Sequence, residues 1–231
     1  MHVVSALLEK NHTTLFAQIK RLAPYFKTFQ IDIADGRFVP NRTVQIEEIS
    51  EFLPHYHLPA SPADRQTTYH KLSFDFHLMV RDYEAEIRKL EKLRNFIKIK
   101  NIFVHYSLHP NIYYLTSNFQ HLTFGLVLDP EDSVDKLTKN YKLRTINCIQ
   151  IMSINPGFQG QEFIPETLKK IEQLRAKDYR NKIYLDGAIN QDTLSTIRSL
   201  EYKPDYLCIG SFLTKTMNLK QNVNYLRSLQ L

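Results

Sequence analysis

Apolar runs of β-rich composition alternate with segments of helical periodicity along nearly the whole chain. Runs typical of buried strands occupy residues 3–8, 28–32, 73–79, 101–105, 123–128, 148–152, 182–186 and 206–209. Between them, apolar residues spaced three and four apart predict helices at residues 13–23, 46–52, 83–95, 111–116, 131–140, 165–176, 192–200 and 219–229.

This strand–helix alternation predicts a parallel sheet with helices packed outside it. For 231 residues, the natural closure is one (β/α)8 TIM barrel that spans residues 1–231 as a single domain. An open doubly wound sheet is the alternative. It is disfavoured because no Gly-x-Gly-x-x-Gly follows the first strand.

Composition narrows the functional classes. The net charge of +6 is spread over helical patterns beside Asp and Glu, which disfavours a nucleic-acid partner and suits a small anionic substrate.

No apolar run approaches the ~18 residues that a membrane span needs, so we expect no membrane partner. The N-terminus resembles no signal peptide. The two cysteines, Cys148 and Cys208, lie in apolar runs, which fits buried thiols in a cytoplasmic protein.

Candidate chemistry collects where the strands end. In a (β/α)8 barrel the carboxyl ends of the strands carry the active site. Asp32 and Asp186 end the second and seventh predicted strands, where a carboxylate must be paired, hydrogen-bonded or bound to metal. His77 lies in the third strand and would be a satisfied core histidine if it stood alone. Convergence with the two aspartates would instead favour a functional site, including a metal site.

Glycines follow the last three strands. They lie in the segments 157–160, 187–188 and 210–211. Any one of them could be an ordinary turn into a helix. Together they predict a phosphate cradle, because barrels commonly bind phosphate with the loops after strands seven and eight.

Six motif segments occur in order along the chain: Ser-Ala-Leu at 5–7, Asp-Ile-Ala-Asp-Gly-Arg-Phe-Val-Pro-Asn at 32–41, Phe-His-Leu-Met at 76–79, Met-Ser-Ile-Asn-Pro-Gly-Phe-Gln-Gly-Gln at 152–161, Asp-Gly at 186–187 and Gly-Ser at 210–211. This set resembles the ribulose-phosphate 3-epimerase family of (β/α)8 barrels, and the resemblance covers nearly the whole chain.

The resemblance implies epimerisation at C3 of a ketose phosphate, with D-ribulose 5-phosphate and D-xylulose 5-phosphate as the expected pair. Asp32 and Asp186 would act as acid and base on opposite faces of the sugar. A divalent metal ion (Zn, Mn, Mg or Fe) would stabilise the enediolate, with ligands at Asp32, His77 and Asp186. The resemblance also suggests substrate contacts from Ser5, His77, Met79, Met152, Gly157, Phe158, Gln159, Gly160, Gly187, Ala188, Gly210 and Ser211. We further expect a homo-oligomer.

The chain departs from the family pattern at several positions. Gln30 stands where the family has its first metal-ligating histidine, so we expect at most weak ligation there. Ala34 replaces a pocket methionine, and Ala188 replaces a glycine near the phosphate. Gln159 also replaces a glycine, so that loop is strained or rearranged if the position needs positive φ. An insertion of about a dozen residues near 55–71 exceeds the usual loop length.

Two functions remain open from the sequence. One is an active epimerase with a modified metal site, acting on ribulose 5-phosphate or another ketose phosphate. The other is a degenerate barrel that binds a sugar phosphate without turnover. Retention of both Asp32 and Asp186 favours the enzyme. An aldolase is disfavoured because no strand-end lysine suits a Schiff base.

Overall fold

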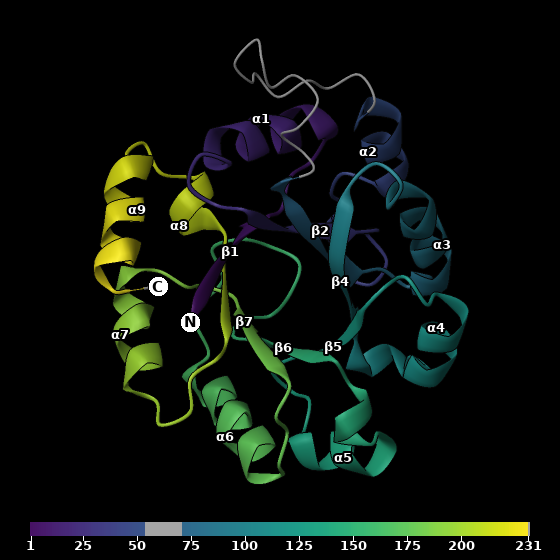
Figure 1. Cartoon of the computed structure of the whole chain (residues 1–231). Helices are drawn as coiled ribbons and strands as arrows, with labels where there is room; N and C mark the ends of the chain where they lie inside the picture. Colours follow the sequence, from purple (N-terminus) through teal and green to yellow (C-terminus); the bar gives the residue numbers. More distant parts are fainter. Residues whose placement is uncertain (54–70, 231) are drawn as a thin grey trace.

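Eight parallel strands close into a barrel in the computed structural model, which describes residues 1–53 and 71–230 (Figure 1). Each strand pairs with the next along the chain, and β1 closes the ring against β8. The TIM barrel is therefore confirmed. The expected insertion near 55–71 lies, except for Lys71, outside the described residues. The strands are β1 (His2–Leu7), β2 (Thr28–Ala34), β3 (Ser73–Met79), β4 (Lys98–His105), β5 (Phe124–Leu128), β6 (Cys148–Met152), β7 (Lys182–Asp186) and β8 (Tyr206–Ile209).

Helices form a ring around the strands (Figure 1). Side chains cap several helix starts: Ser133, for example, accepts from the backbone N–H groups of Asp135 and Lys136. This cap starts α5 at Val134, later than the periodicity predicts. The α-helices are α1 (His12–Leu22), α2 (Ile46–Phe52), α3 (Tyr83–Leu93), α4 (Ile112–Asn118), α5 (Val134–Asn140), α6 (Lys169–Ala176), α7 (Gln191–Ser199), α8 (Ser211–Thr214) and α9 (Leu219–Ser228); short 3-10 turns are η3 (Tyr106–Leu108), η4 (Leu143–Thr145) and η5 (Pro165–Leu168).

Two boundary differences concern the candidate site. β2 runs through Ala34, two residues beyond the predicted strand, because Ile33 and Ala34 keep their pairing with β3. The short α8 directly follows β8, and the sequence does not predict it, since four residues carry no helical periodicity. Both features lie at the carboxyl-end face of the barrel.

Strand alternation divides the buried side chains into two cores. Outward-facing residues such as Phe29, Ile31 and Ile209 pack against the helices. Inward-facing residues such as Val4 and Tyr184 fill the barrel itself. Because side chains alternate between the two faces of a strand, this parity decides which polar residues reach the inside. Among the described residues, no helix has the length and apolar character required to cross a membrane.

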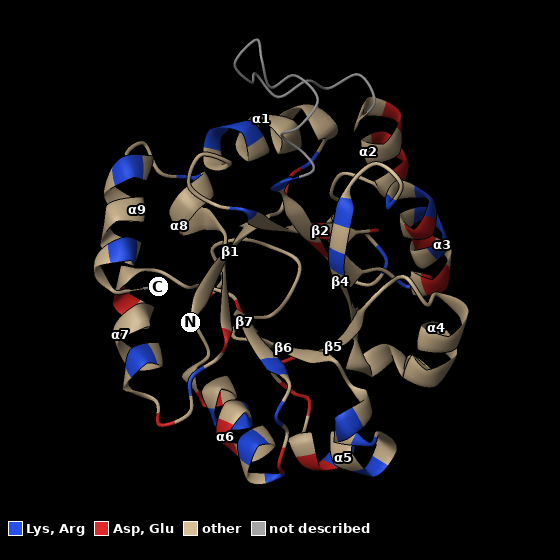
Figure 2. Ribbon diagram, in the orientation of Figure 1, with Lys and Arg blue, Asp and Glu red and all other residues tan. Residues whose placement is uncertain are grey.

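Charged residues of both signs lie on the outer helices, and several of them on α3 are paired within the helix. Lys, Arg, Asp and Glu are intermixed on α3, α5 and α6 (Figure 2). On α3, Arg88 pairs with Glu84 and Lys89 with Glu86, while Ile87 and Leu90 face the core. The basic segment 88–94 is thus a solvated helix face, as its amphipathic pattern indicates.

Candidate active site

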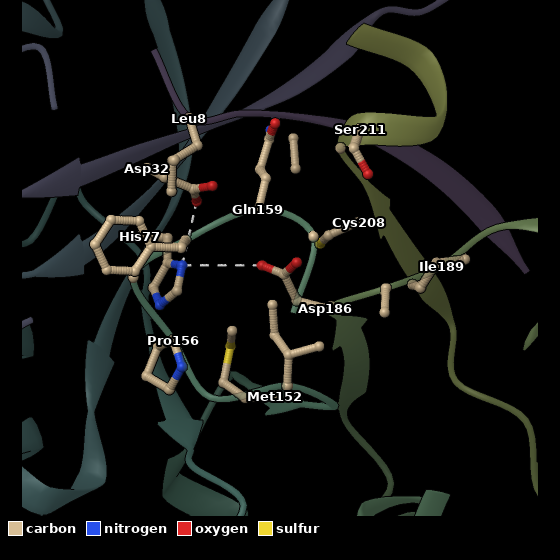
Figure 3. Close-up of a pocket in the computed structure, with 18 of the residues that line it drawn as sticks. Leu8, Asp32, His77, Met152, Pro156, Gln159, Asp186, Ile189, Cys208 and Ser211 are labelled. Atoms are coloured by element: carbon tan, nitrogen blue, oxygen red, sulfur yellow. Dashed lines mark hydrogen bonds and ion pairs between the residues drawn. The ribbon is translucent and has the colours of Figure 1, made fainter. Parts of the chain in front are cut away.

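A cavity opens at the carboxyl ends of the strands, and most of the predicted site residues line it (Figure 3). Their positions follow from strand parity and from the loops after β6, β7 and β8. The predicted residues in the lining are Asp32, His77, Met79, Met152, Gly157, Phe158, Gln159, Gly160, Asp186, Gly187, Ala188, Gly210 and Ser211.

Asp32, His77 and Asp186 converge at the base of this cavity. Asp32 and His77 are direct neighbours in the β2–β3 register. His77 Nδ1 lies 3.2 Å from Asp32 Oδ1 and 3.8 Å from Asp186 Oδ2 (Figure 3). The three groups present one nitrogen and two carboxylate oxygens within 4.8 Å of one another. Three strands far apart in sequence therefore build one acidic centre with an imidazole.

Burial and mutual charge shift the proton affinities of these groups. Burial and the nearby charge of Asp32 raise the pKa of Asp186 to about 7. Burial by itself would lower the pKa of His77, but the hydrogen bond to Asp32 and the charges of Asp32 and Asp186 raise it overall. Two carboxyl groups this close favour a state in which one holds a proton and the other does not. Such a pair suits proton donation and proton removal at neutral pH.

The same donor set fits a divalent cation. One imidazole nitrogen and two carboxylates form a mixed nitrogen and oxygen site of the kind that Zn²⁺ or Mn²⁺ accepts. The buried carboxylates also need a positive partner, since an isolated buried charge is costly. The arrangement is thus compatible with a metal held by Asp32, His77 and Asp186.

Gln30 lies beneath the cavity and differs from its expected role. Its Nε2 donates to Asp32 Oδ1 at 3.0 Å and to Asp186 Oδ2 at 2.6 Å. Its Oε1 instead accepts from the Cys208 thiol at 3.2 Å. In this arrangement the oxygen points away from the carboxylates, so it does not support the predicted weak ligation by Gln30. The side chain acts as an amide donor that bridges the two acids.

Ser5, for which the resemblance implies a substrate contact, is not among the residues that line the cavity. Its register partners are Phe29 and Ile209, whose side chains pack between barrel and helices. The parity of β1 thus turns Ser5 outward, and Ala6 and Leu8 line the cavity in its place.

The sequence reasoning did not assign roles to several residues that support the site. Gln150 on β6 donates a second amide hydrogen bond to Asp186 Oδ2 at 2.9 Å. His105 and Asp129 form a buried hydrogen-bond chain behind His77. His105 ends β4 and Asp129 directly follows β5, which marks them as site candidates, but nothing in the sequence shows which way a strand-end side chain turns. Gln150 lies two residues before Met152 on β6, so the alternation of side chains along a strand could have placed both on the same face.

Hydrogen bonds made by residues 35–41 support the wall of the cavity. Asp35 accepts from the backbone N–H groups of Arg37, Phe38 and Arg81. Asn41 Nδ2 donates to the Gly157 carbonyl, and Lys10 donates to Asn41 Oδ1. This motif therefore fixes the loop after β2 and, through Asn41, the glycine loop after β6.

The glycine loops adopt left-handed backbone at the positions that need it. Gly157, Gly160 and Gly187 have φ of 113°, 86° and 119°. A Cβ on Gly187 would lie 2.6 Å from Ile154 Cγ1, so only glycine fits there. Gln159 is not among the described residues with positive φ, so its substitution leaves that backbone unstrained. Its side chain extends into the cavity, with Nε2 close to Gly210 (Figure 3).

Ala188, by contrast, has φ of 48°, where a Cβ is disfavoured by roughly 1–2 kcal/mol. We therefore expect Ala188→Gly to raise the free energy of unfolding by roughly 0.5–1 kcal/mol, because the lost strain exceeds the added chain entropy of glycine. Urea denaturation with an unchanged m-value would measure this. Ala176→Gly, at a helical position of α6, is the control and should destabilise. A stability loss in Ala188→Gly would contradict strain at this position.

Comparison with known proteins identifies relatives of this chain. The model of the ribulose-phosphate 3 epimerase family matches residues 2–213. Ribulose-phosphate 3-epimerase of Synechocystis is 29% identical over 86% of this chain and 80% of its own length. The enzyme of that name from Bacillus subtilis is 27% identical over 85% of this chain and 84% of its own length. That of Helicobacter pylori is 24% identical and covers all of this chain, with 98% of its own length.

Solved structures share the fold at low identity. KGPDC from Streptococcus mutans, solved as a ligand complex, superposes with a TM-score of 0.64 at 12% identity and covers 98% of this chain and 95% of its own. A mutant tryptophan synthase α-subunit from Pyrococcus furiosus superposes with a TM-score of 0.62 at 14% identity, with 98% of both chains covered. At these identities the likeness concerns the barrel alone.

Proposed function

This chain belongs to the ribulose-phosphate 3-epimerase family, and on that premise we propose that it interconverts D-ribulose 5-phosphate and D-xylulose 5-phosphate. The observation that carries the proposal is the meeting of Asp32 and Asp186 at the base of one cavity. Two carboxyl groups on separate strands allow one to remove the C3 proton while the other returns a proton to the opposite face.

The two acids are suited to complementary roles. Because the pKa of Asp186 is raised by burial and by Asp32, the pair can hold one proton near neutral pH. In each direction the ionised carboxylate takes the proton from C3 of the bound sugar and the protonated one delivers its own. Gln30 and Gln150 hold Asp186 in position through Oδ2, which leaves the other carboxylate oxygen for the substrate.

Asp32, His77 and Asp186 would hold a divalent metal ion. When bound, such an ion supplies Lewis-acid stabilisation of the negative charge that develops on the substrate. The thioethers of Met79 and Met152 border the same cavity and would exclude water from the reacting carbon. Ala34 is buried beside Met79, and its small side chain leaves more room on the Asp32 side.

The phosphate would lie over the loops after β6, β7 and β8. Gly160, Gly187, Gly210 and Ser211 border the cavity at this end, where the short α8 begins. This matches the usual phosphate position in (β/α)8 barrels. The Gln159 amide would add a donor that a glycine at this position cannot offer.

The test is incorporation of solvent deuterium at C3 over a panel of ketose phosphates, with and without Mn²⁺ and Zn²⁺. We expect exchange with D-ribulose 5-phosphate and D-xylulose 5-phosphate, and none with unphosphorylated ribulose. Exchange with another ketose phosphate, and not with these two, would show that the substrate is that other sugar phosphate. Binding of the sugar phosphates without exchange under every metal condition would establish a binding protein and reject the enzyme.

A further inference from the structure

A chain of buried hydrogen bonds leads from His77 away from the cavity. His77 Nε2 lies 2.9 Å from His105 Nε2, and His105 Nδ1 lies 2.9 Å from Asp129 Oδ2. The two imidazole rings stack with centroids 5.0 Å apart. All three side chains are nearly inaccessible to solvent. His105 ends β4 and Asp129 follows β5, so consecutive strands supply the chain.

The donors and acceptors in this series of hydrogen bonds determine which ring nitrogens carry protons. An ionised carboxylate only accepts, so His105 must donate to Asp129 from Nδ1. The two Nε2 atoms face each other, so one of them must donate and the other accept. A ligand nitrogen must offer its lone pair to a cation. If His77 Nδ1 is that ligand, the ring proton of His77 lies on Nε2, and the acceptor is His105 Nε2.

We propose that His105, fixed by Asp129, is a positioning residue that keeps a proton on His77 Nε2. His77 Nδ1, which donates to Asp32 Oδ1 at 3.2 Å when it is protonated, is then the nitrogen that gives up its proton to bind a cation between Asp32 and Asp186. The inference rests on the proposed function, since it concerns the metal site of that function. His105 touches neither of the two acids through any hydrogen bond among the described residues. It acts on the site through His77.

The surroundings hold both supporting residues rigidly. The Lys170 ammonium, itself buried, donates to the backbone carbonyls of Asp129 and Pro130. The backbone N–H of Asp129 donates to Asp132 Oδ2 at 2.8 Å. The Phe38 ring packs on His105 with centroids 4.6 Å apart. His105 thus contacts two rings, those of His77 and Phe38.

The experiment compares metal binding in two matched pairs of variants. His105→Phe keeps a ring but removes the acceptor, whereas His105→Gln keeps a polar group at the reach of Nε2. Asp129→Leu removes the acceptor for His105 Nδ1, whereas Asp129→Asn keeps a carbonyl oxygen. Co²⁺ alone is titrated into each metal-free protein and followed by its visible absorption, and Mn²⁺ binding is measured by calorimetry. Far-UV circular dichroism checks the fold.

We expect His105→Phe and Asp129→Leu to weaken metal binding by about 10–100-fold, the usual effect of losing an outer partner of a metal-bound histidine. His105→Gln and Asp129→Asn should bind within a few-fold of the unaltered protein. The Co²⁺ spectrum should change in the first two variants and not in the last two. A rigid scaffold role alone would not separate the members of each pair in this way.

Other results decide against the inference. Unchanged metal affinity in a folded His105→Phe or Asp129→Leu would overturn it, and so would an unaltered protein that binds no metal. Its failure is distinguishable from that of the proposed function. If the unaltered protein catalyses C3 exchange but the variants keep their metal affinity, the proposed epimerase is supported and the positioning role is rejected. If the variants lose metal affinity as predicted but the unaltered protein shows no C3 exchange, the positioning role is supported and the proposed epimerase is rejected.

Discussion

Replacing Asp186 by asparagine is expected to abolish exchange of the substrate C3 proton with solvent. Removal of a general acid–base group typically lowers the rate by about 10²–10⁴-fold. The amide of asparagine neither takes nor gives that proton, although its shape is nearly the same. Its oxygen can still accept from Gln30 and Gln150, which now donate to Asp186 Oδ2. The fold should therefore survive, and deuterium incorporation at C3 measures the loss.

Asp75→Asn is the matched control for this variant. Asp75 is another fully buried acid of the barrel interior, and burial raises its pKa to about 6. It hydrogen-bonds Asn101 and does not line the cavity. We expect its exchange rate to stay within a few-fold of that of the unaltered protein. Exchange that continues unchanged in Asp186→Asn would remove Asp186 from the mechanism.

The second large effect concerns Gln30→His, which should raise Zn²⁺ affinity at least about tenfold by adding a ligand of the kind that zinc prefers. Gln30 Nε2 contacts one oxygen of Asp32 and one of Asp186, so a side chain at this position reaches the two carboxylates of the proposed metal site. An imidazole would place a nitrogen lone pair where the amide now only donates. Competition with a chromophoric zinc chelator measures the affinity.

Gln30→Met controls for the loss of the amide bridge itself. Methionine removes the donor that joins the two acids but offers no nitrogen. Its Zn²⁺ affinity should stay below that of Gln30→His by about the same factor of ten, since the thioether is a weaker zinc ligand than imidazole. Equal Zn²⁺ affinities in the two variants would mean that a ring at position 30 does not reach the cation.

The fold and the acidic pair were predictable because both depend on short-range pattern. Strand runs show as apolar segments, and a polar residue at the end of such a run stands out. Asp32, His77 and Asp186 are recognisable in this way, and they do converge. The glycine loops that the family resemblance singles out lie at the same cavity.

The differences from expectation share one physical origin, which is the direction of a side chain or backbone bond. The Gln30 amide has a donor nitrogen and an acceptor oxygen, and only its neighbours in the fold decide the orientation of the amide. The nitrogen faces the two acids and the oxygen faces Cys208. Ser5 belongs to a strand whose parity turns it outward. The family pattern predicts strain at Gln159 only if that position needs positive φ, yet φ is positive at Ala188 and not at Gln159.

The amino-acid sequence by itself determined the eight-fold alternation, the order of the strands and the presence of two acids at strand ends, because hydrophobic periodicity and strand-end polarity are local properties. Only the tertiary structure decided that Gln30 donates to both acids and that His105 and Asp129 stand behind His77. Those facts depend on barrel closure, which sets the rotation and register of each strand against its neighbours, and no local pattern encodes that geometry.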